Sequence, residues 1–404
     1  MVNIGLLGLG TVGTGVVEII EKRKSELKDL TEKDINIKKV LVKNIDKERN
    51  IKLEPDVLTS CFEEILKDKE IDIIIEVTGD VELSYKYITE SLNSGKHVVT
   101  ANKAVVSKYF EELSALAEEK NLAFLYEASV GGGIPVLKSL KEALALNKIS
   151  QVLGILNGTC NYILTRMVDE GKNYDEVLKI AQKLGYAEAD PTADVEGHDT
   201  LRKLRILGTL VLQGEIKEED ILLGGISAIN SNDINLFKMM NSTIKLVAEA
   251  KIYEEGYTAV VLPTIVKNSN YFANVNMAFN SVAFEGNNVG QLKFYGSGAG
   301  KLPTANAVLS DVLDIVMDTY RKGNPLGNRE LVNMNSKIKE EFYLRVSGTN
   351  DEIIKALRKI SKKVLTIGAT TAIITEEIEL SKLEDIMSSF KVDKKRYFLA
   401  RILD

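Results

Sequence analysis

Apolar runs alternate with amphipathic stretches in the first third of the chain. Short apolar runs lie at residues 2–7, 40–42, 71–77, 97–101 and 123–129, and helical patterns lie at about 11–24, 82–94 and 105–120. Strands of a parallel sheet are buried on both faces, so they read as near-continuous apolar runs. Strands that alternate with helices in this way predict an α/β fold built on a doubly wound parallel sheet.

A glycine-rich turn follows the first predicted strand. It reads GLGTVG at residues 8–13 and opens a predicted helix. In such a turn the first glycine makes the tight bend, the second lets the backbone approach a pyrophosphate, and the third lets helix and strand pack closely. The free N–H groups of the helix N-terminus favour an anion. In this context the motif predicts a Rossmann-type dinucleotide site, the alternative being an ordinary strand-to-helix turn.

Polar residues and glycines follow the predicted strands of this region. Ligands of doubly wound sheets bind in the crevice at the carboxyl ends of the strands. Those ends carry Gly8, Thr78 with Gly79, Asn102 with Lys103, and residues 127–129. We therefore expect these residues to share one crevice.

Two lysines bear on the choice of ligand. Lys43 follows the second strand, where an NAD site usually has an acid for the ribose hydroxyl. A cation there suits the 2′-phosphate of NADP, so NADP is favoured over NAD, with a solvated basic turn as the alternative. Lys103 stands at the start of a predicted helix, where its charge opposes the helix dipole. We expect a bound cofactor or substrate to stabilise it, the alternative being an exposed loop lysine.

The middle of the chain carries a concentration of acids. Residues 186–203 read YAEADPTADVEGHDTLRK, with Asp199 and Lys203 four apart on a predicted helix and off its apolar stripe. Reduction of a carbonyl needs a proton donor, which Lys203 could supply while Asp199 orients it and balances its charge. On spacing alone, a surface ion pair is the competing interpretation.

Length and composition narrow the class of protein. The chain has 404 residues, which suggests two or three domains, and a formal net charge of -6. This charge argues against a nucleic acid or anionic membrane as partner. No apolar run reaches the ~18 residues of a membrane span, and no signal peptide is expected. With two cysteines, no disulfide framework is expected and a cytoplasmic location is the interpretation.

Several long motifs, in this order, resemble homoserine dehydrogenases: GLGTVG, TANK, EASVGGGIP, GILNGTCNYIL, YAEADPTADVEGHDTLRK and FYGSGAGKLPTANAV. The resemblance covers about residues 1–325 and implies NAD(P)-dependent interconversion of L-homoserine and L-aspartate 4-semialdehyde, in threonine, methionine and isoleucine biosynthesis. Because the fingerprint begins at residue 8, we expect the monofunctional type. The alternatives are another NAD(P)-dependent dehydrogenase of a small amino-acid-derived substrate, or a non-catalytic sensor of amino acids or nucleotides.

The resemblance also implies roles for particular residues. Lys203 and Asp199 would be the catalytic pair, with Lys203 as the proton donor in reduction. The substrate would be bound by Glu188, which would hold its ammonium group, and by Asn157, Gly158, Thr159 and Asp194. The cofactor would be bound by Gly8, Gly10, Thr11, Val12, Gly13, Lys43, Thr78, Lys103 and Gly298. A sodium ion would be held, mostly by backbone oxygens, at Glu127, Val130, Gly132 and Ile134.

Three further residues invite a catalytic interpretation. Cys160 stands where the family usually has threonine, and we do not expect a nucleophilic thiolate because that requires a cationic setting. His97 is interpreted as structural. His198, beside Asp199, is a candidate for the cleft.

The chain is expected to divide into three regions. Residues 1–135, with a return segment at 298–328, would bind the dinucleotide, and residues 136–297 would form an α+β substrate and dimerisation domain. Residues 341–404 predict a βαββαβ order that resembles a small ACT domain. Such domains often bind a regulatory amino acid, here threonine, but residues 347–350 lack the usual Pro-Gly. The alternative is that this region only helps to assemble a homodimer or higher oligomer.

Overall fold

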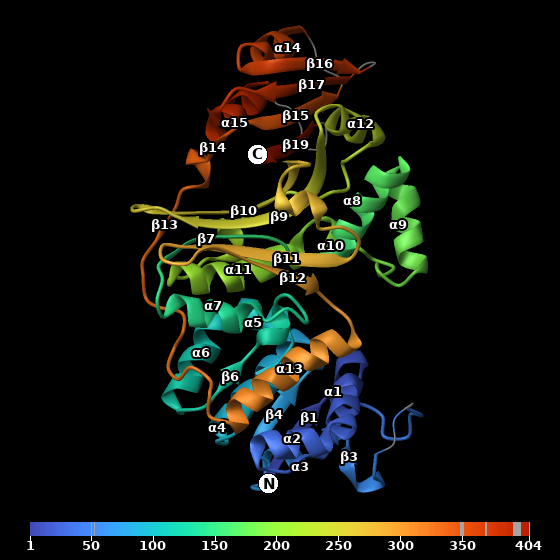
Figure 1. Cartoon of the computed structure of the whole chain (residues 1–404), viewed down its shortest axis with the longest axis vertical. Helices are drawn as coiled ribbons and strands as arrows, with labels where there is room; N and C mark the ends of the chain where they lie inside the picture. The colour runs from blue at the N-terminus through green and yellow to red at the C-terminus, as the bar shows by residue number, and fades with distance from the viewer. Residues whose placement is uncertain (50, 52, 348–350, 368–369, 391–396, 404) are drawn as a thin grey trace.

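The computed structural model describes residues 1–404 except 50, 52, 348–350, 368–369, 391–396 and 404. The chain forms three tiers along its longest axis (Figure 1). The N-terminal sheet and its helices occupy one end, a larger sheet with helices occupies the middle, and the C-terminal strands occupy the other end. No helix in the described part of the chain is both long enough and apolar enough to cross a membrane.

The N-terminal sheet has the predicted Rossmann-type architecture. Its strand order is β3-β2-β1-β4-β5-β6, and every neighbouring pair is parallel. This is the strand order of a dinucleotide-binding sheet. The strands are β1 (Val2–Leu7), β2 (Ile35–Leu41), β3 (Leu58–Thr59), β4 (Ile73–Glu76), β5 (His97–Thr100) and β6 (Phe124–Leu125). The helices are α1 (Thr11–Lys22), α2 (Lys24–Thr31), α3 (Phe62–Leu66), α4 (Val81–Asn93), α5 (Lys103–Lys108) and α6 (Phe110–Glu119), with η1 (Pro55–Val57) before β3.

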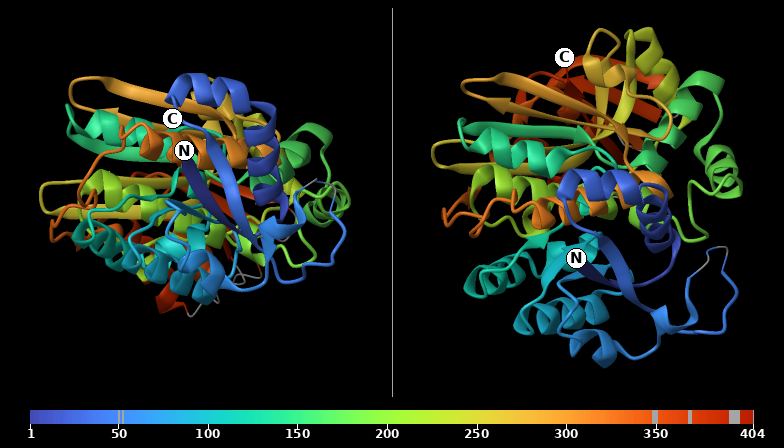
Figure 2. Two further views of the ribbon diagram at one scale, coloured as in Figure 1. Left: turned by 90° about the horizontal axis from the view of Figure 1, so that it is seen from below. Right: turned by 60° about the horizontal axis from the view of Figure 1, so that its bottom comes forward.

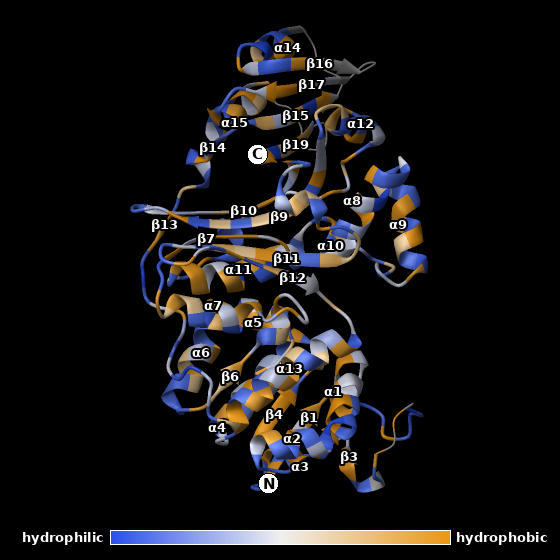
Figure 3. Cartoon of the chain, in the orientation of Figure 1, coloured by the Kyte–Doolittle hydropathy of each residue, from blue (hydrophilic) through white to orange (hydrophobic). Residues whose placement is uncertain are grey.

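Burial on both faces explains the apolar runs. Ile4, Leu6, Ile74 and Val98 are fully buried, and Figure 3 shows the hydrophobic colour concentrated on β1 and β4. Helix α13 (Lys301–Val316) comes much later in the sequence, after the middle tier, and packs against α1, as Figures 1 and 2 both show.

Three of the expected elements differ from the structure by more than two residues. The strand predicted at 123–129 ends at Leu125, because Tyr126 accepts hydrogen bonds from Ser129 and closes the 3-10 turn η2 (Glu127–Ser129). The helix predicted at 105–120 is two helices, α5 and α6, which meet at Tyr109. The second strand begins at Ile35 rather than Val40, since pairing with β1 extends it through its lysines.

The middle tier is built on a second sheet, of order β12-β11-β7-β9-β10-β19-β15-β17-β16. Its central strands are β7 (Ile149–Ile155), β9 (Ser242–Ile252), β10 (Gly256–Lys267), β11 (Phe279–Gly286) and β12 (Gly290–Ser297). Two short strands, β8 (Leu222–Leu223) and β13 (Val332–Asn333), pair with β10. The helices around it are α7 (Val136–Leu144), α8 (Gly158–Glu170), α9 (Tyr174–Lys183), α10 (Thr192–Val195), α11 (His198–Leu212) and α12 (Ser231–Met239), with the 3-10 turns η3 (Glu218–Asp220) and η4 (Tyr271–Asn274).

The C-terminal elements follow the predicted βαββαβ order. They are β15 (Phe342–Ser347), α14 (Asp351–Arg358), β16 (Ser361–Ile367), β17 (Thr370–Thr375), α15 (Leu380–Ser389) and β19 (Tyr397–Leu403). Helix α14 ends at Arg358, shortly before β16 begins at Ser361. The segment that leads into this tier holds η5 (Asn335–Lys337) and β14 (Lys339–Glu340), which pairs with β18 (Ile378–Glu379). Of the predicted effector turn at 347–350, residues 348–350 lie outside the described residues.

The C-terminal tier is joined to the middle tier by one continuous sheet. Strand β19 pairs in parallel with β10 over Thr264–Val266 of β10, a contact that the sequence did not predict. Buried charges strengthen the junction: Arg401 on β19 contacts Glu249 on β9, and Arg345 on β15 contacts the fully buried Asp233 on α12. The two tiers therefore share strands and ion pairs rather than a flexible linker.

Candidate active site

A cavity of about 720 Å³ opens where the carboxyl ends of the N-terminal sheet face the middle tier. Ten of the predicted site residues line it, and they come from elements far apart in the sequence. They are Val12, Lys103, Gly132, Asn157, Gly158, Thr159, Asp194, Asp199, Lys203 and Gly298. Of the strand-end residues expected to share one crevice, Lys103, Ala128 and Ser129 line this cavity, whereas the others do not, and the predicted catalytic pair lines it.

Asp199 lies between two lysines. Its Oδ2 is 2.8 Å from Nζ of Lys203, one turn along α11, and its Oδ1 is 2.9 Å from Nζ of Lys103 at the start of α5. The carboxylate is thus the group that stabilises Lys103 at its helix N-terminus, a partner that the sequence did not reveal. It joins the cofactor tier to the middle tier at the cavity.

The pair is not the surface ion pair that its spacing also allowed. Asp199 is 6% exposed and Lys203 8% exposed. Burial acts to raise the pKa of Asp199, but the charges of Lys203 and Lys103 outweigh it and hold the pKa below its usual range. The Asp199 charge in turn raises the pKa of Lys103 against burial, so Lys103 stays a cation.

The side chain of Asn157 ties the acids of the cavity together. Its Nδ2 donates to Asp199 Oδ2 at 2.9 Å and to Asp194 Oδ1 at 2.7 Å, while its Oδ1 accepts from Cys160 N–H and caps α8. Lys203 also donates to the carbonyl of Leu156 at 2.7 Å. Two of its three ammonium protons are therefore committed, and the remaining direction is available to a ligand in the cavity.

The turn between β1 and α1 is shaped for a phosphate. Gly8 has a φ of 103°, and a Cβ on Gly13 would lie 2.1 Å from the Gly8 carbonyl oxygen. At Gly10, by contrast, no protein atom lies within 4 Å of an added Cβ. Helix α1 has no side-chain cap and no acid in its first turn, so its N–H groups can receive an anion. These residues fit the pyrophosphate of a nicotinamide dinucleotide.

One buried carboxylate was missed by the sequence reasoning. Glu76 ends β4, is fully buried, and accepts hydrogen bonds from Thr78, Ser84 and Thr100. It fixes the ends of β4 and β5, and so the start of α5 on which Lys103 stands. The signal was present, since a single acid inside the apolar run IDIIIEV must find hydrogen-bond donors when buried.

Some predicted residues lie outside the cavity lining. Thr78 uses its hydroxyl on Glu76, 2.6 Å away, and therefore does not face the cavity as the strand-end argument supposed. Lys43 is exposed two residues after β2, whose last carbonyl, that of Leu41, accepts from Gly8 N–H at 3.0 Å. Glu188 is exposed in the loop after α9, two residues beyond Tyr186, which does line the cavity.

The proposed cation loop lies beside the cavity, although Gly132 alone of its four residues lines it. The carboxylate of Glu127 accepts from the backbone of Leu137 at 2.9 Å and of Lys138 at 2.7 Å, so it already caps the start of α7. In the part of the chain that the structure describes, no donor contacts the carbonyls of Val130 or Gly132, although both residues are buried. Buried carbonyl oxygens without donors are the ligands that a sodium ion would satisfy.

Sequence reasoning missed the segment Met277–Phe279, which forms one wall of the cavity, and also Tyr186 and Thr304. Tyr186 stacks on Tyr162 with ring centroids 4.5 Å apart. Tyr186 and Thr304 stand inside two of the family motifs but were given no role, whereas none of those motifs covers residues 277–279.

Three catalytic candidates remain: Cys160, His97 and His198. None of them lines the cavity. Burial raises the pKa of the Cys160 thiol well above its usual value, and Sγ donates to the Asp194 carbonyl. Nδ1 of His97 accepts from Ala123 N–H, which agrees with the structural role expected for it. His198 is exposed and does not line the cavity, so it is not a cleft residue here.

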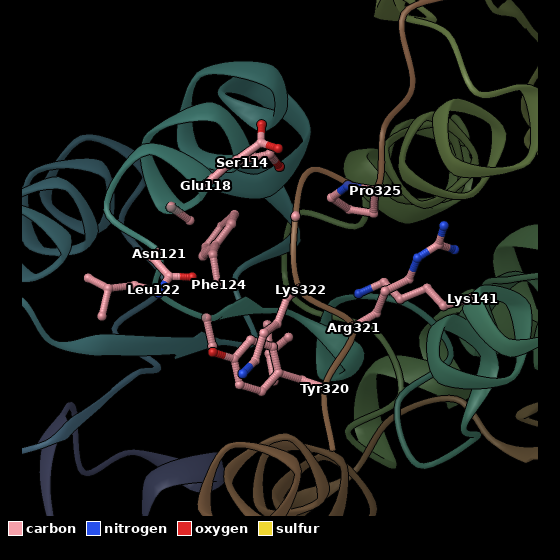
Figure 4. Close-up of a pocket in the computed structure, with 14 residues that line it drawn as sticks. Ser114, Glu118, Asn121, Leu122, Phe124, Lys141, Tyr320, Arg321, Lys322 and Pro325 are labelled. Carbon is pink, nitrogen blue, oxygen red and sulfur yellow. The ribbon is translucent and has the colours of Figure 1, made fainter. Parts of the chain in front are cut away.

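A second, smaller cavity of about 130 Å³ lies between α6, β6 and the segment that follows α13 (Figure 4). Phe124, Tyr320, Lys141 and Arg321 are among its lining residues. It contains none of the predicted site residues, whereas the larger cavity is lined by ten of them.

A Rossmann-type sheet with a glycine turn shaped for a phosphate, next to a cavity that holds a buried lysine–carboxylate pair, fits the class of nicotinamide-dependent dehydrogenases. Two family models match the chain, one described as the NAD binding domain of homoserine dehydrogenase over residues 8–127, the other as homoserine dehydrogenase over residues 135–313. The chain belongs to the homoserine dehydrogenase family. It is an oxidoreductase of amino-acid biosynthesis.

Individual relatives agree with this assignment. The chain is 44% identical over 322 residues to the homoserine dehydrogenase of Bacillus subtilis, covering 80% of this chain and 74% of that protein. It is 45% identical over 319 residues to that of a Synechocystis strain, covering 78% and 73%. A solved homoserine dehydrogenase from Thiobacillus denitrificans has a TM-score of 0.92 at 32% identity, covering 100% of this chain and 98% of that one. A hyperthermophilic archaeal homoserine dehydrogenase in complex with NADPH has a TM-score of 0.67 at 25% identity, covering 80% and 99%.

Proposed function

We propose that the large cavity is where homoserine and aspartate 4-semialdehyde are interconverted, with Lys203 as the group that moves the proton. The bound nicotinamide supplies or accepts the hydride. The observation that carries the proposal is the buried Asp199, held between Lys203 and Lys103 at the cavity wall. A spectrophotometric assay with homoserine and each cofactor tests it. Malate, lactate and glutamate, assayed separately in place of homoserine, are the alternative substrates.

In this proposal each side chain has a separate task. Lys203 gives a proton to the carbonyl oxygen in reduction and takes it back in oxidation. Asp199 orients Lys203 and keeps Lys103 charged, so that Lys103 acts as a fixed cation beside the reacting oxygen. Asn157 donates a hydrogen bond to each of Asp199 and Asp194 and so fixes the two carboxylates relative to each other. Asp194, which lines the cavity, and Glu188, exposed in the loop two residues beyond the cavity residue Tyr186, would receive the substrate ammonium group.

NADP is the cofactor that we propose, with NAD as the alternative. Lys43 is exposed just beyond the strand end that bonds to the glycine turn, where the ribose of a bound dinucleotide would lie. We expect Lys43→Ala to raise the KM for NADPH about tenfold, the loss of one charged hydrogen bond, and to leave the KM for NADH unchanged. Initial rates with both cofactors measure this. Lys47→Ala is the matched control, and an equal effect of both variants would refute the assignment.

We also propose that a sodium ion is held by the loop of Glu127, Val130, Gly132 and Ile134. The carbonyls of Val130 and Gly132, which accept from no donor in the described part of the chain, support it. We expect NaCl, but not tetramethylammonium chloride of equal ionic strength, to raise the melting temperature by a few degrees through binding to the folded state. Equal melting curves in the two salts would exclude the ion.

Assembly and regulation are the last elements of the proposal. A homodimer follows from the family resemblance, and light scattering would then give twice the 44.6 kDa of the chain. An amino-acid effector at the C-terminal tier is testable by titrating threonine into the full-length enzyme. Deletion of residues 341–404 is a poor test, because it would remove β19 from its pairing with β10.

A further inference from the structure

Lys245 is a buried lysine that forms an ion pair with no acid in the described part of the chain. It lies on β9 and is 1% exposed, one of the largest fully buried side chains of the chain. Its Nζ donates to the carbonyl of Val275 at 2.6 Å, to Oδ1 of Asn276 at 3.0 Å and to Oδ1 of Asn161 at 3.2 Å. All three acceptors are neutral, and Asp169 on α8 is the acid whose charge acts on it from a distance.

Two of the acceptors, Val275 and Asn276, belong to one segment, and the third, Asn161, also binds that segment. Asn161 on α8 also donates from Nδ2 to the carbonyls of Val275 and Phe279, each at 3.0 Å. Lys245 and Asn161 therefore bind both ends of residues 275–279. The middle of this segment, Met277–Phe279, is the cavity wall.

The segment is packed tightly against the substrate side of the cavity. A Cβ on Gly158 would lie 2.7 Å from the carbonyl oxygen of Ala278, so the two backbones are already in contact. Gly158 follows Asn157, whose side chain contacts both Asp199 and Asp194. A shift of the segment would therefore be transmitted to the acids of the site.

We propose that Lys245 is a positioning residue for the reaction, which sets the cavity wall 275–279 against the substrate loop at Asn157–Gly158. It touches neither substrate nor cofactor and acts through backbone carbonyls. The role rests on the large cavity being the reaction site. It goes beyond the catalytic pair, because the residue stands on a different strand and makes no contact with that pair.

The burial of Lys245 costs stability, which supports a functional reason for it. Burial lowers the pKa of Lys245 from 10.5 to about 8. A cation whose pKa is lower in the folded state destabilises that state while it is charged, and this cost disappears as pH rises through the folded and then the unfolded pKa. At pH 7 a methionine of similar length would avoid the cost while losing the three hydrogen bonds.

The test separates stability from positioning. At pH 7 we expect Lys245→Met to melt within a few degrees of the wild type, since loss of the buried charge offsets loss of the donor to three oxygens. We expect it to bind NADPH with unchanged Kd and to lose at least about tenfold in kcat/KM for homoserine, as misplaced site groups do. Lys251→Met, on the same strand but partly exposed, is the matched control. A well-folded Lys245→Met with the kinetics of that control would overturn the proposal.

A second pair of variants covers the case in which Lys245→Met does not fold. Asn276→Asp keeps an oxygen acceptor for the Lys245 ammonium group and should retain wild-type kcat/KM. Asn276→Ala removes this hydrogen bond and should raise the KM for homoserine severalfold. Equal kinetics for the two would refute the role of Lys245. Lys203→Ala is run alongside: if it also keeps its activity, the site assignment has failed rather than the positioning role.

Discussion

Lys203→Ala is expected to lower kcat for homoserine oxidation by about 10³-fold, within the range of general acid–base catalysis. The side chain that would move the proton is removed, while the glycine turn that would bind the cofactor is on another tier. NADPH affinity, measured by fluorescence titration, should therefore change little. The expected loss falls on kcat and kcat/KM together, as for an interaction made only in the transition state.

The control for this variant lies on the same helix. Arg202→Ala also removes a cation from α11, but Arg202 does not line the cavity. Its kcat should stay close to that of the wild type. Near-normal turnover of Lys203→Ala would contradict the mechanism, and an equal loss in Arg202→Ala would point to helix stability instead.

Asp199→Asn should be the second large effect, on both catalysis and stability. The amide keeps the shape of the side chain but leaves Lys203 and Lys103 without their shared counter-charge. Breaking a buried ion pair costs about 3–5 kcal/mol, and we expect a loss of this order in the free energy of unfolding at pH 7. We also expect kcat/KM for homoserine to fall by at least about 10²-fold, since Lys203 loses its orienting partner. Urea unfolding and initial rates measure the two effects.

The stability effect has a defined dependence on pH. The pKa of Asp199 is lower in the folded state than its ordinary value of 3.8, so its contribution is complete above that value. The contribution disappears as pH falls through the lower folded pKa. The difference between wild type and Asp199→Asn should therefore shrink below about pH 4. Asp175→Asn, an exposed acid on α9, should show no such difference, and a pH-independent gap would contradict the ion triad.

The first sheet was predictable because its signals are local. Burial on both faces leaves apolar runs such as 71–77, and the turn at 8–13 needs glycines that any reader of the sequence can see. The Asp199–Lys203 pair also follows from helical spacing, and family motifs identified the reaction. The end of the strand predicted at 123–129 was placed wrongly, because a turn closed by a hydrogen bond from Ser129 to Tyr126 leaves no periodic pattern in the sequence.

The sequence by itself determined the order and type of the main elements of the first and last tiers, the dinucleotide turn and the identity of the acid–lysine pair. Only the tertiary structure decided which groups meet: Lys103 with Asp199 across 96 positions, β19 with β10, and Lys245 with the wall 275–279. The reason is physical. Periodicity and turn chemistry act between near neighbours, whereas burial and the pairing of charges depend on how whole elements pack. Lys245 is the clearest example. Apolar and polar residues alternate along β9, as in a strand with one face in water, but in the structure η4 packs over its second face.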